Sequence, residues 1–168
     1  IGARRGKIIV TSRRREEGGR FTGSEGARVS LLSKAALLDA NYVDVESSTE
    51  AALRDELLRT VRTRRGRVRL IVSRHDFRET PSDRTLEGWL EGCFESGADI
   101  AKIVTLANTD EEFVEAVKTT LALRKEMKVP FIHLIGGKFA LPHRYLSPTL
   151  GNALTFCVER YTPAFITL

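Results

Sequence analysis

The chain contains, at residues 97–105, the stretch Gly-Ala-Asp-Ile-Ala-Lys-Ile-Val-Thr. Its β-branched residues, with a glycine at the start and Asn108 shortly after, are typical of a short buried strand. Lys102 lies in the middle of this strand, where an ammonium group would lose most of its hydration. A buried lysine tends to become neutral, and a neutral amine on a rigid strand can form a Schiff base with a carbonyl compound. Alternatively, the flexible side chain reaches water from the end of a strand. The stretch by itself leaves both interpretations open.

Strand and helix patterns alternate along the rest of the chain. Short β-branched or apolar runs predict further strands at residues 7–12, 42–46, 68–73, 129–135 and 153–158. Apolar residues at helical spacing predict helices over residues 25–40, 49–63, 82–93 and 109–121. The first helix carries two apolar series, namely Val29, Leu32 and Ala36, and Leu31, Ala35 and Leu38. The period of about thirty residues is typical of repeated βαβ units and a parallel sheet.

Six strands of one repeating type fit either an open doubly wound sheet or a (β/α) barrel. No strand is followed by Gly-x-Gly-x-x-Gly or by a phosphate-binding loop, which argues against a nucleotide-binding sheet. Polar residues gather where the predicted strands end: Arg13, Glu17, Asp44, Glu46, Arg74, His75 and Lys102. Barrel enzymes place their catalytic groups at these strand ends. The pattern therefore favours an α/β chain that forms a (β/α) barrel.

The composition is that of an ordinary globular protein. The 168 residues suffice for one domain, residues 1–168, and 42% of them are hydrophobic and 29% charged. The sequence has neither an apolar run as long as a membrane span nor a signal-peptide pattern. Because it begins with Ile1 instead of Met, we expect a processed or excised piece. Cys93 and Cys157 lack metal-ligand spacing and are interpreted as small buried residues in a reducing compartment, so we expect a cytoplasmic protein.

The net charge of +5 comes from local arginine clusters, at residues 4–5, 13–15 and 62–69. Such clusters can bind nucleic acid, meet a small anionic substrate, or simply be solvated. Aromatic residues do not alternate with the arginines, and no nucleic-acid-binding motif is recognisable. Nucleic acid is therefore the least favoured partner.

Four motifs, in this order along the chain, resemble those of the type I 3-dehydroquinate dehydratases. Residues 11–19, Thr-Ser-Arg-Arg-Arg-Glu-Glu-Gly-Gly, resemble a strand that ends in Arg-x-x-x-Glu-Gly-Gly, and residues 42–46, Tyr-Val-Asp-Val-Glu, resemble the next strand. Residues 73–77, Ser-Arg-His-Asp-Phe, resemble the segment of the family's catalytic histidine. Residues 97–103 resemble the strand of its Schiff-base lysine. The resemblance covers nearly the whole chain.

The resemblance implies an eight-stranded (β/α) barrel, usually a homodimer, that uses neither metal nor cofactor. It implies conversion of 3-dehydroquinate to 3-dehydroshikimate and water, in the shikimate or quinate pathway. Lys102 would form an imine with the substrate ketone, and His75 would remove the adjacent proton and later protonate the leaving hydroxyl. Glu17 matches the glutamate that orients the histidine. Arg13 and Arg144 match the arginines that hold the substrate, Arg144 by a bidentate grip on its carboxylate.

The chain departs from the family pattern in three places. Two initial βα units of the family have no counterpart here. In the loop that closes the family's site, Tyr161 stands at the position of a serine and Phe165 at that of a glutamine, so the resemblance implies that both contact the substrate. Leu134-Ile135-Gly136 replaces a Met-x-Met strand. Six of eight βα units cannot close an eight-stranded barrel, so we expect either a partial chain or a second copy that covers the open edges.

Three functions remain open at this point. The first is an active 3-dehydroquinate dehydratase. The second is a catalytically impaired dehydroquinase-like domain with a regulatory role, as in fungal quinate-pathway repressors. The third is a nucleic-acid-binding module. His133 and His143 match no catalytic position, and we interpret both as structural. We expect Lys102 to project into the mouth of the barrel, within contact range of His75, because the two residues lie at the ends of neighbouring strands.

Overall fold

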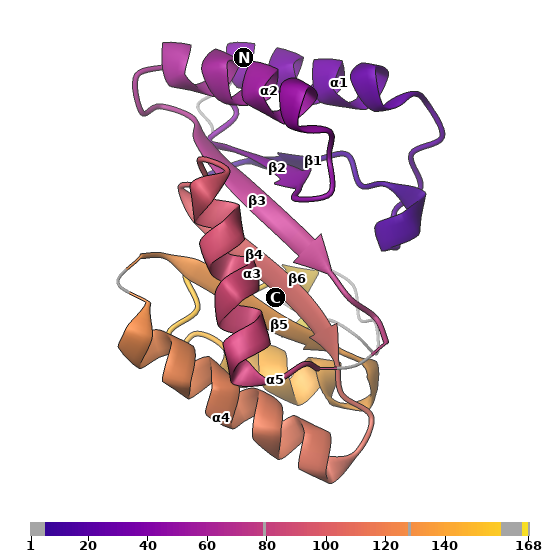
Figure 1. The fold of residues 1–168 in the computed structure, drawn as a ribbon, viewed down its shortest axis with the longest axis vertical. Coiled ribbons are helices and arrows are strands. Elements are labelled where there is room, and N and C mark those ends of the chain that lie inside the picture. The colour runs from indigo at the N-terminus through magenta and orange to yellow at the C-terminus, as the bar shows by residue number, and fades with distance from the viewer. Residues whose placement is uncertain (1–5, 79, 128, 159–165, 168) are drawn as a thin grey trace. The chain divides into compact units, whose positions relative to one another are not determined.

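The computed structural model describes residues 6–78, 80–127, 129–158 and 166–167 (Figure 1). Its main strands and helices alternate along the chain: β1 (Ile9–Thr11), α1 (Glu25–Leu37), β2 (Tyr42–Glu46), α2 (Ala51–Thr63), β3 (Arg69–His75), α3 (Asp83–Glu95), β4 (Ile100–Leu106), α4 (Asp110–Glu126), β5 (Phe131–Gly136) and α5 (Ala140–Leu146). Two 3₁₀ turns, η1 (Arg15–Glu17) and η2 (Gly137–Phe139), and two short strands, β6 (Cys157–Val158) and β7 (Ile166–Thr167), complete it. The alternation predicted from the sequence is confirmed.

The five longer strands follow the order β1-β2-β3-β4-β5 in one sheet. The pairs β1–β2, β2–β3 and β4–β5 are parallel: Val10 lies opposite Val43, Val43 opposite Leu70, and Lys102 opposite Ile132. This arrangement confirms the predicted α/β class. β3 continues to His75, two residues past the predicted end of that strand, so the candidate histidine is the last residue of a strand.

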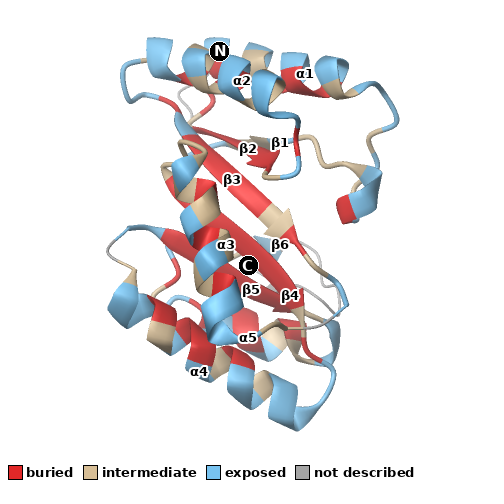
Figure 2. Cartoon of the chain, in the orientation of Figure 1, coloured by how far each residue is buried: buried red, intermediate tan, exposed pale blue. Residues whose placement is uncertain are grey.

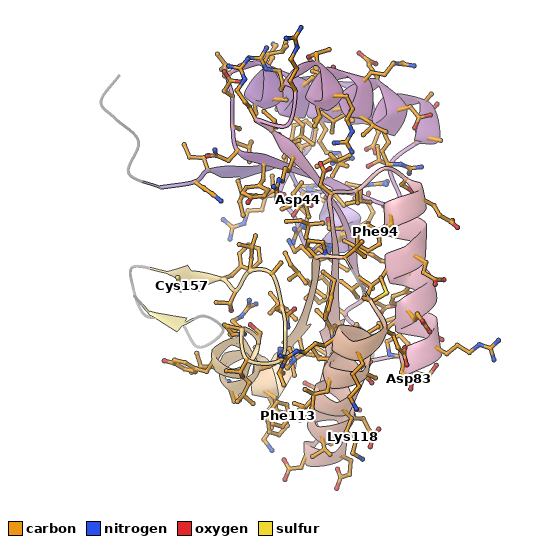
Figure 3. All side chains as sticks on the ribbon, turned by 90° about the vertical axis from the view of Figure 1, so that its left-hand side faces the viewer. Asp44, Asp83, Phe94, Phe113, Lys118 and Cys157 are labelled. Carbon is orange, nitrogen blue, oxygen red and sulfur yellow. The ribbon has the colours of Figure 1, made fainter. Side chains whose placement is uncertain are left out.

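The sixth predicted strand, at residues 153–158, is reduced to the two residues of β6, which pairs with β7 in a separate sheet. The N–H of Ala153 still donates to the carbonyl oxygen of Phe131 on β5 (2.9 Å). The hydroxyl of Thr155 then donates to the carbonyl oxygen of Arg144 (3.0 Å). After Ala153, the segment therefore contacts α5 and does not continue to pair with β5. Cys157 on β6, labelled in Figure 3, is exposed, contrary to the prediction that both cysteines are buried, whereas Cys93 is buried.

The chain divides into two compact units, residues 1–73 with 93–99, and residues 74–92 with 100–168. In the first unit, α1 lies beside α2 and against β2. Ser24 caps α1 by accepting the N–H of Ala27 (3.2 Å). Of the two apolar series on α1, the one that begins with Val29 is buried, whereas Leu38 is 74% exposed. Figure 2 shows the same pattern of burial, with buried strands and helices that are buried along one side.

The second unit is built on β4 and β5. The capping box of α4, in which Thr109 and Glu112 each accept the other's backbone N–H, is formed as the Thr-x-x-Glu pattern predicts. Phe113 of α4, labelled in Figure 3, stacks on Phe139, with ring centroids 4.8 Å apart, and both pack against a buried cluster of Ala107, Ala116 and Ile135. Within the described part of the chain, no helix is both long and apolar enough to cross a membrane.

Candidate active site

Arg13 and Glu17 lie in the turn that follows β1, and two glycines allow the backbone to adopt this turn. Gly18 has a φ of 78°, in the left-handed region that glycine adopts without steric cost. Gly19 has no room for a side chain, since a Cβ there would lie 2.0 Å from the carbonyl oxygen of Arg13. The N–H of Gly19 donates to the carbonyl oxygen of Arg14 (2.7 Å). The Glu-Gly-Gly motif is therefore explained by the geometry of this turn.

Glu17 is buried although it lies in a short turn, with 8% of its surface exposed. One carboxylate oxygen accepts a hydrogen bond from the hydroxyl of Ser48 (2.6 Å). Ser48 also accepts from the guanidinium of Arg14 (3.1 Å), so it joins the turn after β2 to the turn after β1. Sequence reasoning did not identify Ser48, and no pattern in the sequence distinguishes it from other loop serines.

Arg13 lies beside the two acidic residues at the end of β2. Its Nη2 is 3.5 Å from Asp44 Oδ2, and its Nε is 4.0 Å from Glu46 Oε1. The hydroxyl of Ser73 donates to the other oxygen of Asp44 (2.6 Å). Asp44, labelled in Figure 3, thus takes part in a charged cluster of the first unit.

Arg28 completes this cluster from α1. Its guanidinium is buried and contacts Glu46 Oε2, Glu25 Oε1 (2.9 Å), Thr49 Oγ1 (2.6 Å) and the carbonyl oxygen of Ser12 (3.1 Å). Burial raises the pKa of Glu46, and the positive charge of Arg28 opposes that increase. Arg28 was not among the predicted site residues; only its spacing of three from Glu25 indicated an ion pair on the helix.

His75 ends β3 and belongs to the second unit together with Lys102. The N–H of Asp76 donates to the carbonyl oxygen of Val104 (2.8 Å), which places His75 level with Val104 on β4. Alternate residues of a strand point to the same face, so the side chains of His75 and Lys102 share one face of the sheet. His75 is buried, and its ring centroid lies 6.0 Å from that of Phe77.

Lys102 is 4% exposed, and the residues around it on β4 are buried as well. This burial decides against the interpretation that its side chain reaches water at a strand end. Its Nζ lies 4.8 Å from the centroid of the Phe156 ring, a cation–π distance. Phe156 was not predicted to contact the lysine, because it precedes β6 by one residue and is far from Lys102 in the sequence.

Arg144 lies on α5 and is also buried. Desolvation lowers the pKa of its guanidinium. The sequence-predicted residues are therefore divided between the units: Arg13 and Glu17 are in the first, and His75, Lys102 and Arg144 are in the second.

His133 on β5 is fully buried, and both of its ring nitrogens lie within hydrogen-bond distance of threonine hydroxyls. The hydroxyl of Thr120 donates to the carbonyl oxygen of Ala116 (2.7 Å), so it accepts a hydrogen bond from the imidazole Nδ1–H of His133 (2.8 Å). The hydroxyl of Thr105 lies 3.2 Å from Nε2, which is then the acceptor. Burial lowers the pKa of His133 to about 3, so the ring is neutral at ordinary pH. Its register opposite Ile103 places it on the face away from Lys102.

The chain that carries these side chains is similar in sequence and structure to known proteins. Residues 3–162 match the Type I 3-dehydroquinase family. The chain belongs to this family. A 3-dehydroquinate dehydratase of Desulfotalea psychrophila is 33% identical over 150 residues. The bifunctional 3-dehydroquinate dehydratase/shikimate dehydrogenase of Arabidopsis thaliana is 32% identical over 149 residues. The crystal structure of the 3-dehydroquinate dehydratase of Geobacillus kaustophilus superimposes with a TM-score of 0.85 at 28% identity.

The type I dehydroquinase relatives are longer than this chain. The matches cover 89% of this chain and 65% of the Desulfotalea protein, and 88% of this chain and 23% of the Arabidopsis protein. The Geobacillus structure covers 96% of this chain, which spans 63% of that structure.

Two of the positions predicted from the dehydroquinase resemblance cannot be placed. Tyr161 and Phe165 lie outside the described residues. Among the residues that are described, no group of three or more His, Cys, Asp or Glu side chains could hold a metal ion.

Proposed function

We propose that this chain carries the catalytic groups of a type I 3-dehydroquinate dehydratase, which converts 3-dehydroquinate to 3-dehydroshikimate and water. The observation that supports the proposal best is the burial of Lys102 on a sheet face that His75 shares. A buried amine on the same sheet face as an imidazole is suited to imine chemistry, because the amine supplies the nucleophile and the imidazole transfers protons near neutral pH. Membership of the dehydroquinase family supports the choice of 3-dehydroquinate as the substrate.

In the proposed reaction, the amine of Lys102 attacks the ketone carbon of 3-dehydroquinate, and loss of water gives an iminium ion. The iminium nitrogen accepts electron density, so the neighbouring C–H becomes acidic and His75 removes its proton. The carbon–oxygen bond of the β-hydroxyl then breaks, and His75 returns the proton to the departing oxygen, which leaves as water. Hydrolysis of the imine consumes one water and releases the lysine. The net products are one 3-dehydroshikimate and one water.

The remaining predicted residues take supporting roles in this proposal. Glu17 is proposed to orient His75, and Arg13 and Arg144 to bind the substrate. A planar guanidinium can bind a carboxylate through two parallel hydrogen bonds, which an ammonium cannot, so Arg144 is proposed to bind the substrate carboxylate. Tyr161 and Phe165 are proposed as substrate contacts from their positions in the family motif alone.

The imine is tested by trapping it. The chain is incubated with 3-dehydroquinate and sodium borohydride and then weighed by mass spectrometry. We expect one ligand adduct on the wild-type chain and none on Lys102→Ala, because the reduced bond is formed to this amine. The matched control is Lys118→Ala, since Lys118 is exposed on α4 and should not affect the adduct (Figure 3). An adduct that persists in Lys102→Ala would contradict the assignment.

The proton transfer is tested with His75→Ala. We expect this variant to form the trapped adduct but to lose the rise in enone absorbance that reports 3-dehydroshikimate, by about 100-fold or more. If the wild-type chain neither binds nor traps 3-dehydroquinate at millimolar concentration, the proposed activity is wrong. The fold would then serve a binding or regulatory role.

A further inference from the structure

We propose that Arg28 is a positioning residue that holds the turn at residues 12–19, and with it Arg13 and Glu17, in the geometry needed for activity. This inference rests on the proposed function, because it assigns Arg13 and Glu17 to the site. Arg28 itself is not proposed to contact substrate.

The burial of Arg28 is the first observation. Its side chain is 1% exposed, and it is the largest cation of the first unit that is fully buried among the described residues. A guanidinium removed from water is stable only when its donors are matched by acceptors. The position of Arg28 therefore depends on the segments that supply those acceptors.

All five N–H groups of Arg28 are directed to acceptors. Nε donates to Glu25 Oε2 (3.4 Å), and Nη2 donates to Glu25 Oε1 (2.9 Å) and Thr49 Oγ1 (2.6 Å). Nη1 donates to the carbonyl oxygen of Ser12 (3.1 Å) and to Glu46 Oε2. These acceptors come from the start of α1, from the end of β2 and its following turn, and from Ser12, the residue that follows β1. One side chain thus ties three segments together.

Glu46 connects Arg28 to the turn. While one of its carboxylate oxygens binds Arg28, the other accepts the backbone N–H of Arg14 (3.1 Å). The same oxygen lies 4.0 Å from Nε of Arg13. Ser12, which Arg28 binds directly, immediately precedes Arg13. Arg28 therefore fixes both the beginning of the turn and the carboxylate that orients Arg13.

A lysine at position 28 could not form these five hydrogen bonds, although it would carry the same charge. An ammonium has three donors on one atom, whereas the guanidinium has five in a planar fork. If Arg28 only neutralised Glu46, the Arg28→Lys variant would behave like the wild type. If the planar set of guanidinium donors holds the turn in place, Arg28→Lys should increase amide exchange in the turn and lower kcat/KM about as much as Arg28→Met does.

The matched control is Arg54 on α2. Its Nη1 donates to the carbonyl oxygens of Ser47 (2.9 Å) and Thr49 (3.0 Å), so it too anchors a turn of the first unit. Its described hydrogen bonds go to the turn after β2 and not to Ser12 or Glu46. Arg54→Met removes an arginine and its turn contacts without removing the connection to Arg13.

The experiment combines amide hydrogen exchange with steady-state kinetics on Arg28→Met, Arg28→Lys and Arg54→Met. In both Arg28 variants we expect exchange at Arg14, Gly18, Gly19 and Phe21 to accelerate at least tenfold, and kcat/KM to fall by about 10–100-fold, as for other residues that orient site groups. Arg54→Met should leave both readouts within about threefold of the wild type. Arg28→Lys retains the buried positive charge, so it serves if Arg28→Met does not fold.

Two results would overturn the inference. One is wild-type exchange of the turn in Arg28→Lys, and the other is a loss of kcat/KM no greater in the Arg28 variants than in Arg54→Met. A wild-type chain that forms no borohydride adduct would refute the proposed function instead. Exchange in the turn would still show whether Arg28 positions Arg13 and Glu17.

Discussion

His133 and His143 are both fully buried in the second unit, and burial lowers the pKa of each imidazole, to about 3 for His133 and to about 4 for His143. The positive charge of Arg144 lowers the pKa of His143 further. The two rings meet edge to face, with centroids 5.8 Å apart. No described residue forms a hydrogen bond with either ring nitrogen of His143. An apolar side chain should therefore replace His143 more easily than His133, which binds Thr105 and Thr120.

This burial predicts how stability depends on pH. An unfolded histidine has a pKa of about 6.5, so below that pH the unfolded chain binds protons that the native chain excludes. The free energy of unfolding is then highest above pH 6.5 and falls as the pH decreases toward the native pKa, by about 1.4 kcal/mol per pH unit for each histidine. Between pH 6 and 5, we expect His143→Leu to reduce this slope by about 1.2 kcal/mol per unit.

Urea unfolding at several pH values measures the slope. Tyr145→Phe is the control, because Tyr145 is an exposed residue on the same helix. Its slope should equal that of the wild type. An unchanged slope in His143→Leu would show that this histidine is protonated in the native chain.

At the scale of elements, the connection from β1 to α1 carries two of the predicted site residues and depends on glycine. A Cβ at Gly19 would lie within 2.0 Å of the Arg13 carbonyl oxygen and 2.6 Å of the Arg14 carbonyl oxygen. Both are backbone atoms, so relief requires the turn to move. In contrast, a Cβ at Gly88, in the middle of α3, would have no neighbour within 4 Å.

Gly19→Ala should therefore lower the free energy of unfolding by roughly 2–3 kcal/mol, through backbone strain. It should also lower any activity by more than the loss of folded protein explains, because Arg13 is displaced. Gly88→Ala should raise stability by about 1 kcal/mol, since alanine is favoured over glycine within a helix. Chemical denaturation measures the free energy of unfolding of both variants. Equal effects would show that the turn tolerates a side chain.

At the scale of the whole molecule, the sheet order leaves β1 and β5 with one neighbour each among the described strands. Exposed apolar residues flank both strands: Ile8 precedes β1 at 38% exposure, and Val129 precedes β5 at 42%. Parallel strands are normally covered on both faces, and an open strand edge is a site of association.

We therefore predict that the chain self-associates. Sedimentation equilibrium at micromolar concentration should give twice the monomer mass. Ile8→Lys and Val129→Lys should shift the equilibrium toward monomer, because charge at an edge opposes pairing. Val114→Lys should not shift it, because Val114 is also an exposed apolar residue but lies on a helix, α4, and not at the start of an edge strand. A wild-type chain that remains monomeric would contradict the prediction.

The sequence by itself determined the elements and the motif positions of this protein. The strand around Lys102, the capping box of α4 and the glycines of the turn after β1 were predictable, because alternation, helix caps and left-handed turns depend on neighbours a few residues apart. The family motifs placed Arg13, Glu17, His75 and Lys102 in order, and the chain's membership of the type I dehydroquinases agrees with them.

Only the tertiary structure decided which of these side chains are buried and what they contact. α1 carries two apolar series, and contacts with distant residues bury Val29 while leaving Leu38 exposed. Arginine is usually found at the protein surface. Arg28 is buried because hydrogen-bond acceptors on β2 and just after β1 surround its guanidinium. Burial and choice of partner depend on segments that lie far apart in the chain, so no local pattern encodes them.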